Sequence, residues 1–359
     1  VNGVATFNNV TVSKAGTGYT LTATDGNLTS DTSAAFNIVS AAPAKLAFTT
    51  QPPPTAQSGA SFAVGVTVQD AGGNTVVGNS SSVTVVLTTA AGATLGGTTT
   101  KAASAGVATF SGLSIDKAGT YTLTATDGAL TAAVSTSITI SHGAAAKLAF
   151  TSPPPASIAA GAGFGAVVTV QDAAGNTVTG NSSQVSVALT SANGATLGGT
   201  KSVAASNGVA TFSGLSVAKA GSYSLTATDS ALTPAVSNTF TIIPGAAASI
   251  VFTTQPVSPL AGVTFGVAVS IEDSVGNVET ADNATQITLS TNVCSNALLR
   301  TVTVTGGVAQ FPNLRFYTSG SSRQLIAQAS IGLGVSSTTF TVQANPDLIF
   351  ADDFATCTP

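Results

Sequence analysis

The stretch Gly106–Gly128, GVATFSGLSIDKAGTYTLTATDG, decides the fold because it recurs along the chain. It returns as Gly208–Asp229, GVATFSGLSVAKAGSYSLTATD, and stands earlier as Gly3–Gly26, GVATFNNVTVSKAGTGYTLTATDG. A diverged fourth version, GVAQFPNLRF, occupies Gly307–Phe316. Self-similarity at a fixed period is the sequence signature of a repeat architecture. The chain therefore consists of copies of one structural unit.

The period of the repeat is roughly 100 residues. Phe48, Phe150 and Phe252 hold the same place in KLAFTTQP, KLAFTSPP and SIVFTTQP. We predict three whole domains at 44–142, 143–245 and 246–344, with short linkers that favour an elongated row. A half domain at 1–43 holds only the last strands of the unit, and residues 345–359 form a C-terminal tail.

Each whole repeat shows the short alternating segments of a two-sheet β-sandwich, so the predicted fold class is all-β. In the first, Lys45–Thr50 is an apolar strand, and Ser61–Asp70 alternates apolar with small or polar residues. We expect Thr98–Ala102 to pair with Val107–Phe110 across the turn at Ser104–Gly106. The remaining expected strands are Val83–Thr88, Thr120–Thr126 and Val134–Ile140.

The composition excludes several classes of partner. Charged residues make up 7% of the chain and the net charge is −4, so it has no basic surface for a nucleic acid. No apolar run is long enough for a transmembrane helix. Met is absent even at position 1, from which we expect a processed chain or a fragment of a longer one.

Three segments resemble a known family. They are KLAFTTQP at 45–52, VQDAAGNTVTG at 170–180 and the stretch at 106–128, and they resemble the bacterial immunoglobulin-like repeats of surface proteins such as invasins and intimins. The resemblance covers nearly all of the chain except 345–359. It implies tandem immunoglobulin-like sandwiches, an extracellular or cell-surface location, and a role as stalk, adhesin or fibre. It also implies a tyrosine corner at Tyr19, Tyr121 and Tyr223, where the third whole repeat has Arg323.

We predict no catalytic, cofactor-binding or metal-binding residue. His142, the single His, lies in a linker, whereas a Ser-His-Asp site needs a carboxylate and a hydroxyl beside the ring. The turns Asp70–Asn74, Asp172–Asn176 and Asp273–Asn277 offer oxygen ligands for Ca²⁺. Asp and Asn also satisfy the backbone of a turn, and without a D-x-D-x-D spacing we favour that interpretation.

Other polar motifs have equally plain interpretations. Lys45 and Lys147 begin first strands, as do the lysines of intramolecular isopeptide bonds, but the last strand of the first whole repeat has no Asn or Asp partner and Ser249 replaces the third Lys. Triplets of the form N-x-S/T begin at Asn79, Asn181 and Asn283. They are glycan sites in a eukaryotic secreted protein and polar loop residues in a bacterial one.

Two features near the ends suggest assembly. An apolar face in 1–43 (Val4, Phe7, Tyr19, Leu21, Phe36 and Ile38) cannot stay folded in water without a cover, either from upstream residues or from another copy. The tail segment Asp347–Phe350, DLIF, resembles the first strand KLAF, with Leu348 and Phe350 alternating as a strand would. Our hypothesis is head-to-tail strand addition, which generates a filament where it does not close. Cys294 and Cys357 are predicted to form a disulfide, within one chain or between neighbours.

A non-enzymatic extracellular fibre subunit without cofactors is therefore the function that the sequence favours. Its partners are copies of itself or upstream repeats of a longer chain. The alternative is the stalk or binding region of an adhesin that recognises a host receptor or a glycan, although aromatic residues make up only 6% of the chain.

Overall fold

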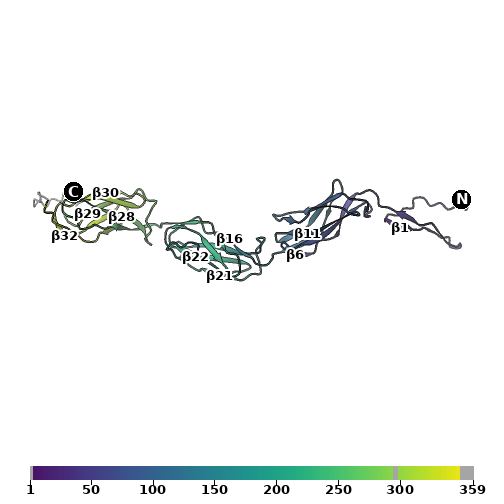
Figure 1. The fold of residues 1–359 in the computed structure, drawn as a ribbon, viewed down its shortest axis with the longest axis horizontal. Coiled ribbons are helices and arrows are strands. Elements are labelled where there is room, and N and C mark those ends of the chain that lie inside the picture. Colours follow the sequence, from purple (N-terminus) through teal and green to yellow (C-terminus); the bar gives the residue numbers. More distant parts are fainter. Residues whose placement is uncertain (1–2, 294–297, 348–359) are drawn as a thin grey trace. The chain divides into compact units, whose positions relative to one another are not determined.

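A computed structural model of the chain describes residues 3–293 and 298–347, and their regular secondary structure consists of strands (Figure 1). Within these residues no helix is long and apolar enough to cross a membrane. The predicted all-β class is confirmed. The chain divides into two compact units: Val1–Lys147 with Val170–Asn181 and Ser206–Gly208, and Leu148–Thr169 with Ser182–Ala205 and Val209–Pro359.

The first whole repeat folds as an immunoglobulin-like sandwich. Its strands are β5 (Lys45–Thr50), β6 (Thr55–Gln57), β7 (Phe62–Gln69), β8 (Ser82–Leu87), β9 (Leu95–Gly96), β10 (Thr100–Ala102), β11 (Val107–Ile115), β12 (Gly119–Tyr121), β13 (Leu123–Thr126), β14 (Ala133–Val134) and β15 (Ile138–Ser141). One sheet has the order β5-β7-β11-β9 and the other the order β10-β8-β13-β14. A third small sheet, β12-β15-β6, contains the parallel pair β15 and β6. Two layers with this strand order are the immunoglobulin-like arrangement.

The later repeats have corresponding strands. The second contains β16 (Lys147–Ser152), β17 (Ser157–Ala159), β18 (Phe164–Gln171), β19 (Gln184–Leu189), β20 (Leu197–Gly198), β21 (Ser202–Ala204), β22 (Val209–Val217), β23 (Gly221–Tyr223), β24 (Leu225–Thr228), β25 (Ala235–Val236) and β26 (Phe240–Ile243). The third contains β27 (Ala247–Thr254), β28 (Phe265–Asp273), β29 (Gln286–Thr291), β30 (Leu298–Thr303), β31 (Val308–Leu314), β32 (Gly320–Arg323), β33 (Leu325–Ala329), β34 (Gly334–Ser336) and β35 (Phe340–Val342). The sheets β16-β18-β22-β20 and β27-β28-β31 match the first sheet of the first repeat, and β21-β19-β24-β25 and β30-β29-β33-β34 match the second.

The pairing predicted for Thr98–Ala102 is wrong. β10 pairs with β8 in one sheet, whereas β11 pairs with β7 in the other. The chain changes sheets at buried Ala103 and then turns through left-handed backbone at Ala105 (φ 49°) and Gly106 (φ 77°). Ser104 and Val107 form one bridge across this turn. The two strands then diverge, because β8 offers an open edge to β10 and β7 offers one to β11.

Two further predicted strands are each divided where the chain changes sheets. Thr120–Thr126 becomes β12 and β13, and Val134–Ile140 becomes β14 and β15. β12 pairs with β15, while β13 pairs with β14 and β8. The buried Ser135 hydroxyl fixes the change, since it accepts the Leu123 N–H at 2.9 Å and donates to the Thr136 carbonyl at 2.8 Å. Ser237 and Ser337 do the same in the later repeats.

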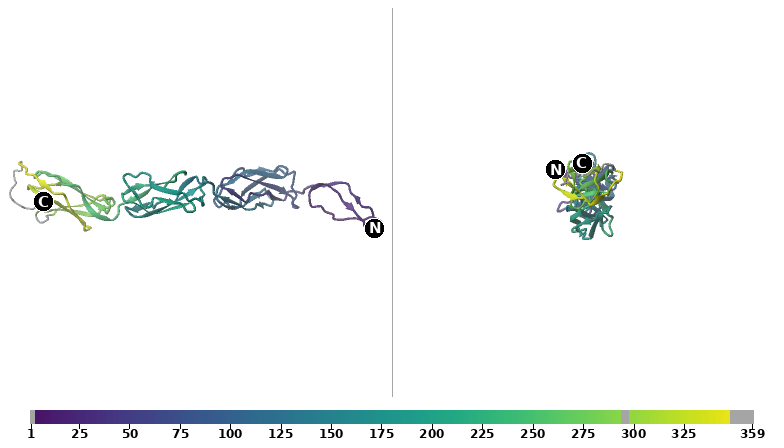
Figure 2. Two further views of the ribbon diagram at one scale, coloured as in Figure 1. Left: turned by 90° about the horizontal axis from the view of Figure 1, so that it is seen from below. Right: turned by 90° about the vertical axis from the view of Figure 1, so that its left-hand side faces the viewer.

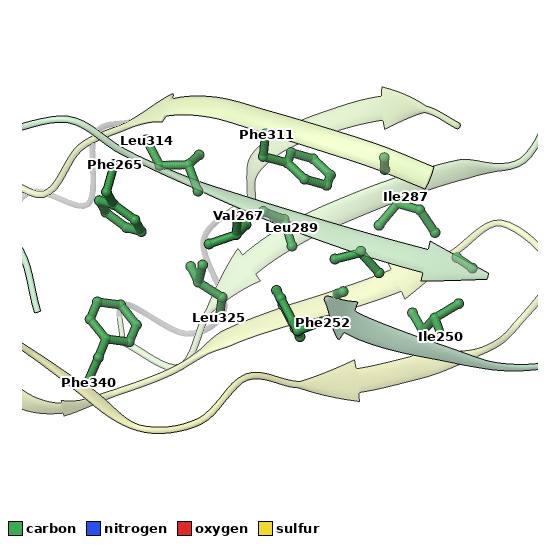
Figure 3. Close-up of a cluster of buried hydrophobic side chains, with 14 of the residues drawn as sticks. Ile250, Phe252, Phe265, Val267, Ile287, Leu289, Phe311, Leu314, Leu325 and Phe340 are labelled. Atoms are coloured by element: carbon green, nitrogen blue, oxygen red, sulfur yellow. The ribbon is translucent and has the colours of Figure 1, made fainter. Parts of the chain in front are cut away.

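A core of buried hydrophobic side chains fills each sandwich. Figure 3 shows the core of the third repeat, in which Phe265, Phe311 and Phe340 point into the space between the sheets. The ring centroids of Phe265 and Phe340 lie 5.9 Å apart in a tilted arrangement, which is favourable for aromatic pairs.

The Gly that begins the GVA motif of each whole repeat is required by a close backbone approach. A Cβ atom on Gly106 would lie 2.5 Å from the Val76 carbonyl oxygen, and φ is also positive there. The same clash would arise at Gly208 and Gly307. This contact joins the start of β11, β22 and β31 to the loop that follows the Asp-x-x-Gly-Asn turn.

Residues 3–43, here called the half-unit, form a single layer of short strands (Figure 2). β1 (Gly16–Tyr19) pairs with β4 (Phe36–Ile38), and β2 (Thr22–Ala23) pairs with β3 (Asp31–Thr32). Residues 4–8 form no strand, although the corresponding residues of the first whole repeat begin β11.

Candidate functional site

The half-unit exposes the side chains that whole repeats bury. Phe7 is 76% exposed, whereas its counterpart Phe110 is 0% exposed. Val10 and Leu21 are likewise exposed, and their counterparts Leu113 and Leu123 are buried. These exposed apolar side chains are the candidate interaction surface of the described residues.

The hairpin geometry of the half-unit is nevertheless that of a whole repeat. The Ser33 hydroxyl accepts the Leu21 N–H at 3.0 Å and donates to the Ala34 carbonyl at 2.9 Å, as Ser135 does in the first repeat. The Tyr19 hydroxyl donates to the Lys14 carbonyl at 3.1 Å. What differs is therefore the cover over the apolar face.

The tyrosine corner that the resemblance implies is observed at Tyr19 and Tyr223. Besides Tyr19, Tyr223 donates through its hydroxyl to the Lys219 carbonyl at 3.0 Å. In the third repeat the Arg323 guanidinium takes over this contact and donates to the Thr318 carbonyl at 2.8 Å. Arg323 lies over the ring of Phe316, with 5.2 Å from Cζ to the ring centroid, and burial lowers its pKa. Arg323 therefore makes the corner contact of the third repeat, although the replacement of Tyr by Arg had placed that contact in doubt.

The Asp of each Asp-x-x-Gly-Asn turn accepts hydrogen bonds from its own turn and from the preceding linker. The buried Asp70 carboxylate accepts the Asn74 N–H at 2.8 Å, the Asn74 amide group at 3.0 Å and the Ala41 N–H at 2.9 Å. These bonds, the Asn74 side chain first, lower the pKa of Asp70 from its usual 3.8 to about 2. The carboxylate is therefore held ionised by donors, which is the predicted turn role.

Asp172 and Asp273 have the same surroundings. Burial raises the pKa of Asp273, but bonds from the Asn277 side chain and the Gly245 N–H outweigh it and lower the value to about 2. Burial also acts on Asp172, and bonds from Gly143 and Asn176 again leave its pKa below the usual range.

The Asn side chains of these turns have a contact that sequence reasoning missed. The Asn74 amide oxygen accepts the Ala15 N–H, which lies 59 residues earlier in the chain, at 2.8 Å. Asn176 and Asn277 make the same contact with Ala118 and Ala220, at separations of 58 and 57 residues. The similar spacing, 57 to 59 residues, between the Ala of a Lys-Ala-Gly motif and the Asn of the next Asp-x-x-Gly-Asn turn is the sequence signal that could have found it.

The other candidate side chains contact nearby backbone. The His142 ring nitrogen Nδ1 lies 2.9 Å from the Gly143 carbonyl oxygen. Lys45 and Lys147 donate to the turn carbonyls of Ala71 and Ala173. In the part of the chain that the structure describes, no three His, Cys, Asp or Glu side chains gather as possible metal ligands.

Several predicted residues lie outside the described residues. These are Cys294 and Cys357, with their predicted disulfide, and the proposed strand-donor residues Leu348 and Phe350. The disulfide and the donor strand stay predictions.

Comparison with solved structures finds matches at low sequence identity. The Escherichia coli adhesin FdeC shares 18% identity, over 86% of this chain and 100% of that chain, with a TM-score of 0.34. InvD of Yersinia pseudotuberculosis shares 18% identity over 84% and 98%, with a TM-score of 0.33. Extracellular domains 3–5 of Drosophila OTK share 15% identity over 86% and 100%, with a TM-score of 0.29. No protein-family model and no curated protein matches the sequence.

Proposed function

We propose that the chain is a non-enzymatic extracellular structural protein, a subunit of a surface fibre whose half-unit is completed by a neighbouring copy. The observation that carries the proposal is the exposed apolar face of residues 3–43 beside its buried counterparts. The sequence resemblance to bacterial surface repeats supports the extracellular location and the structural role.

The missing cover has a defined geometry in the first whole repeat. There β7 pairs antiparallel with β11, which places Val64 opposite Phe110 and Phe62 opposite Leu113. An incoming strand along residues 4–10 would restore the same pairing and cover Phe7 and Val10. Main-chain pairing at an open edge is the general mode of strand addition.

The C-terminal tail is the segment that we assign to this position. Its sequence DLIF at 347–350 alternates like the first strand of a repeat. In the first repeat that strand, β5, pairs mainly with β7 and touches the second half of the unit at Thr131. A tail that took only the β5 position would leave Phe7 uncovered. The proposal therefore places it along residues 4–10, with the neighbour's third repeat covering the rest.

Electron microscopy of the full chain at increasing concentration tests the proposal. Filaments should form with a concentration threshold, because completion by a neighbour follows mass action. Deletion of 345–359 and the substitution Phe7→Ser should each abolish them. Val236→Ser, which changes an exposed apolar residue in the second repeat, is the matched control and should leave them intact.

Two outcomes would overturn the fibre proposal. Unchanged filaments after deletion of the tail would exclude the donor strand. Monomeric particles at every concentration would exclude completion by a neighbour, and if such particles bound cells or glycans, the adhesin alternative would be favoured.

A further inference from the structure

The Asn side chains of the three Asp-x-x-Gly-Asn turns make one recurring contact with the repeat before them. Each amide oxygen accepts one N–H, and each amide nitrogen donates to the carbonyl two residues earlier, all at 2.8 Å. The acceptor and donor pairs are Ser13 and Ala15 for Asn74, Asp116 and Ala118 for Asn176, and Ala218 and Ala220 for Asn277. The amide thus binds two main-chain groups at once.

The bound segment is recognised without regard to its side chains. The carbonyl comes from Ser13, Asp116 or Ala218, three residues of different size and charge, yet the distance is 2.8 Å in each case. Only main-chain atoms are common to the three. A primary amide carries its acceptor and its two donor hydrogens on separate atoms, so the short Asn side chain can bind an N–H, a carbonyl and the Asp carboxylate at once, which fits its presence at all three positions.

The neighbouring Asp fixes the orientation of the amide. The Asn176 nitrogen has two hydrogens, and it donates to the Asp172 carboxylate at 2.9 Å as well as to the Asp116 carbonyl. A flipped amide would turn its oxygen towards both the carboxylate and the carbonyl, which is unfavourable. The same carboxylate accepts the Gly143 N–H of the linker at 2.8 Å. The Asp carboxylate therefore binds the linker and fixes the orientation of the Asn side chain.

We infer that each of these Asn residues is a docking group for the preceding repeat, and that its ligand is the main chain of the Lys-Ala-Gly turn. The first compact unit includes Val170–Asn181 together with the whole first repeat, and the contact of Asn176 lies inside that unit. The contact of Asn277 lies inside the second unit. At Asn176 the amide nitrogen also lies 2.9 Å from the Ser58 hydroxyl, but the contacts common to all three Asn residues are with main-chain atoms, so any repeat that presents this turn fits. The inference is independent of fibre formation.

Residue-resolved amide hydrogen exchange on the full chain tests this inference. In Asn176→Ala the Ala118 amide should exchange about tenfold faster, the factor for losing one hydrogen bond of ordinary strength. Amides within β11 should be unchanged. Asn238→Ala, the same substitution at an exposed position of the second repeat, should leave Ala118 protected.

A second variant separates main-chain from side-chain recognition. Lys117→Ala removes the middle side chain of the bound turn and leaves its main chain in place, so Ala118 should stay protected. If Lys117→Ala deprotects Ala118 as strongly as Asn176→Ala does, main-chain recognition is wrong. Equal exchange of Ala118 in Asn176→Ala and the parent chain would exclude the contact altogether. Should Asn176→Ala unfold the second repeat, Asn277→Ala with Ala220 as the probe gives the same decision.

Discussion

The half-unit and the second half of the first whole repeat have nearly the same sequence but different structures. Both begin with GVATF. In both, a Ser hydroxyl (Ser33 or Ser135) accepts a backbone N–H and donates to the carbonyl of the next residue, an arrangement here called the serine bracket. Only the whole repeat forms a strand from the GVATF segment, the nine-residue β11. Gly106 packs against the Val76 carbonyl, whereas nothing lies within 4 Å of a Cβ atom placed on Gly3.

The comparison separates what a segment forms by itself from what needs a partner. Hydrogen bonds between residues close in sequence, such as those of Ser33 and Tyr19, are present in both regions. Strand β11 and the burial of Phe110 depend on β7, which lies some 40 residues away in the chain. The half-unit therefore keeps the hydrogen bonds between residues close in sequence and lacks the strand pairing that whole repeats make between distant segments.

The largest expected difference between the two regions comes from their matching Phe residues. Phe110→Ala should lower the free energy of unfolding of the first repeat by about 3–5 kcal/mol, because it leaves a cavity in a closed core. Phe7→Ala in the unassembled chain should change stability by less than about 0.5 kcal/mol, since the ring is already in water. Amide exchange of β11 and β13 residues measures the first quantity, and that of β1 and β4 residues the second.

The control for this pair is Val86→Ala, an exposed apolar position in β8. A small effect of Phe110→Ala, similar to that of Val86→Ala, would mean that the first repeat is not closed around this ring. A large effect of Phe7→Ala at low concentration would mean that its cover lies within the same chain.

A smaller difference is expected for the serine bracket. Ser135→Ala leaves the buried Leu123 N–H without its acceptor, which should cost about 1–3 kcal/mol. Ser33→Ala should cost a few tenths at most, because water replaces the hydroxyl at the exposed Leu21 N–H. Exchange of the Leu123 and Leu21 amides is the direct measurement. Equal effects at both positions would contradict the view that burial, rather than the bond itself, sets the cost.

The elements that the sequence predicted best are those with a local pattern. Lys45–Thr50 is a strand with the expected bounds, and Tyr121, Leu123 and Ala125 share the buried face. The division of Thr120–Thr126 was missed because the alternation continues unchanged while the hydrogen-bond partner changes from β15 to β8. Side-chain period reports which face is buried and carries no information about which strand lies at the edge.

The candidate site was predictable to a similar degree. The apolar face of residues 1–43 follows from the repeat alone, since the matching positions of the whole repeats lie in the core. The docking role of Asn74 did not follow, because Asp and Asn are favoured in turns for local reasons and their outward contacts leave no periodic trace. The docking role is visible only in the structure, where Asn74 binds the Ala15 N–H and the Ser13 carbonyl of the preceding turn.

The weakest expected effect is a shift in titration at the border between the half-unit and the first repeat. Asp70 has a pKa of about 2 in the folded chain, below its usual 3.8, and the Asn74 side chain is the largest cause. The ionised carboxylate therefore stabilises the folded state above about pH 4, and this contribution is lost as the pH falls through about 2. In Asn74→Ala the pKa of Asp70 should rise towards its usual value.

Asp273 provides the internal control in the same sample, because its partner Asn277 is unchanged and its pKa should stay at about 2. The carboxyl carbon shifts of both residues, followed from pH 6 to pH 1.5, give the two midpoints (the range brackets both states of a carboxyl group of about pKa 2–4). A midpoint for Asp70 that does not move in Asn74→Ala would show that the linker N–H of Ala41 holds the carboxylate without the amide.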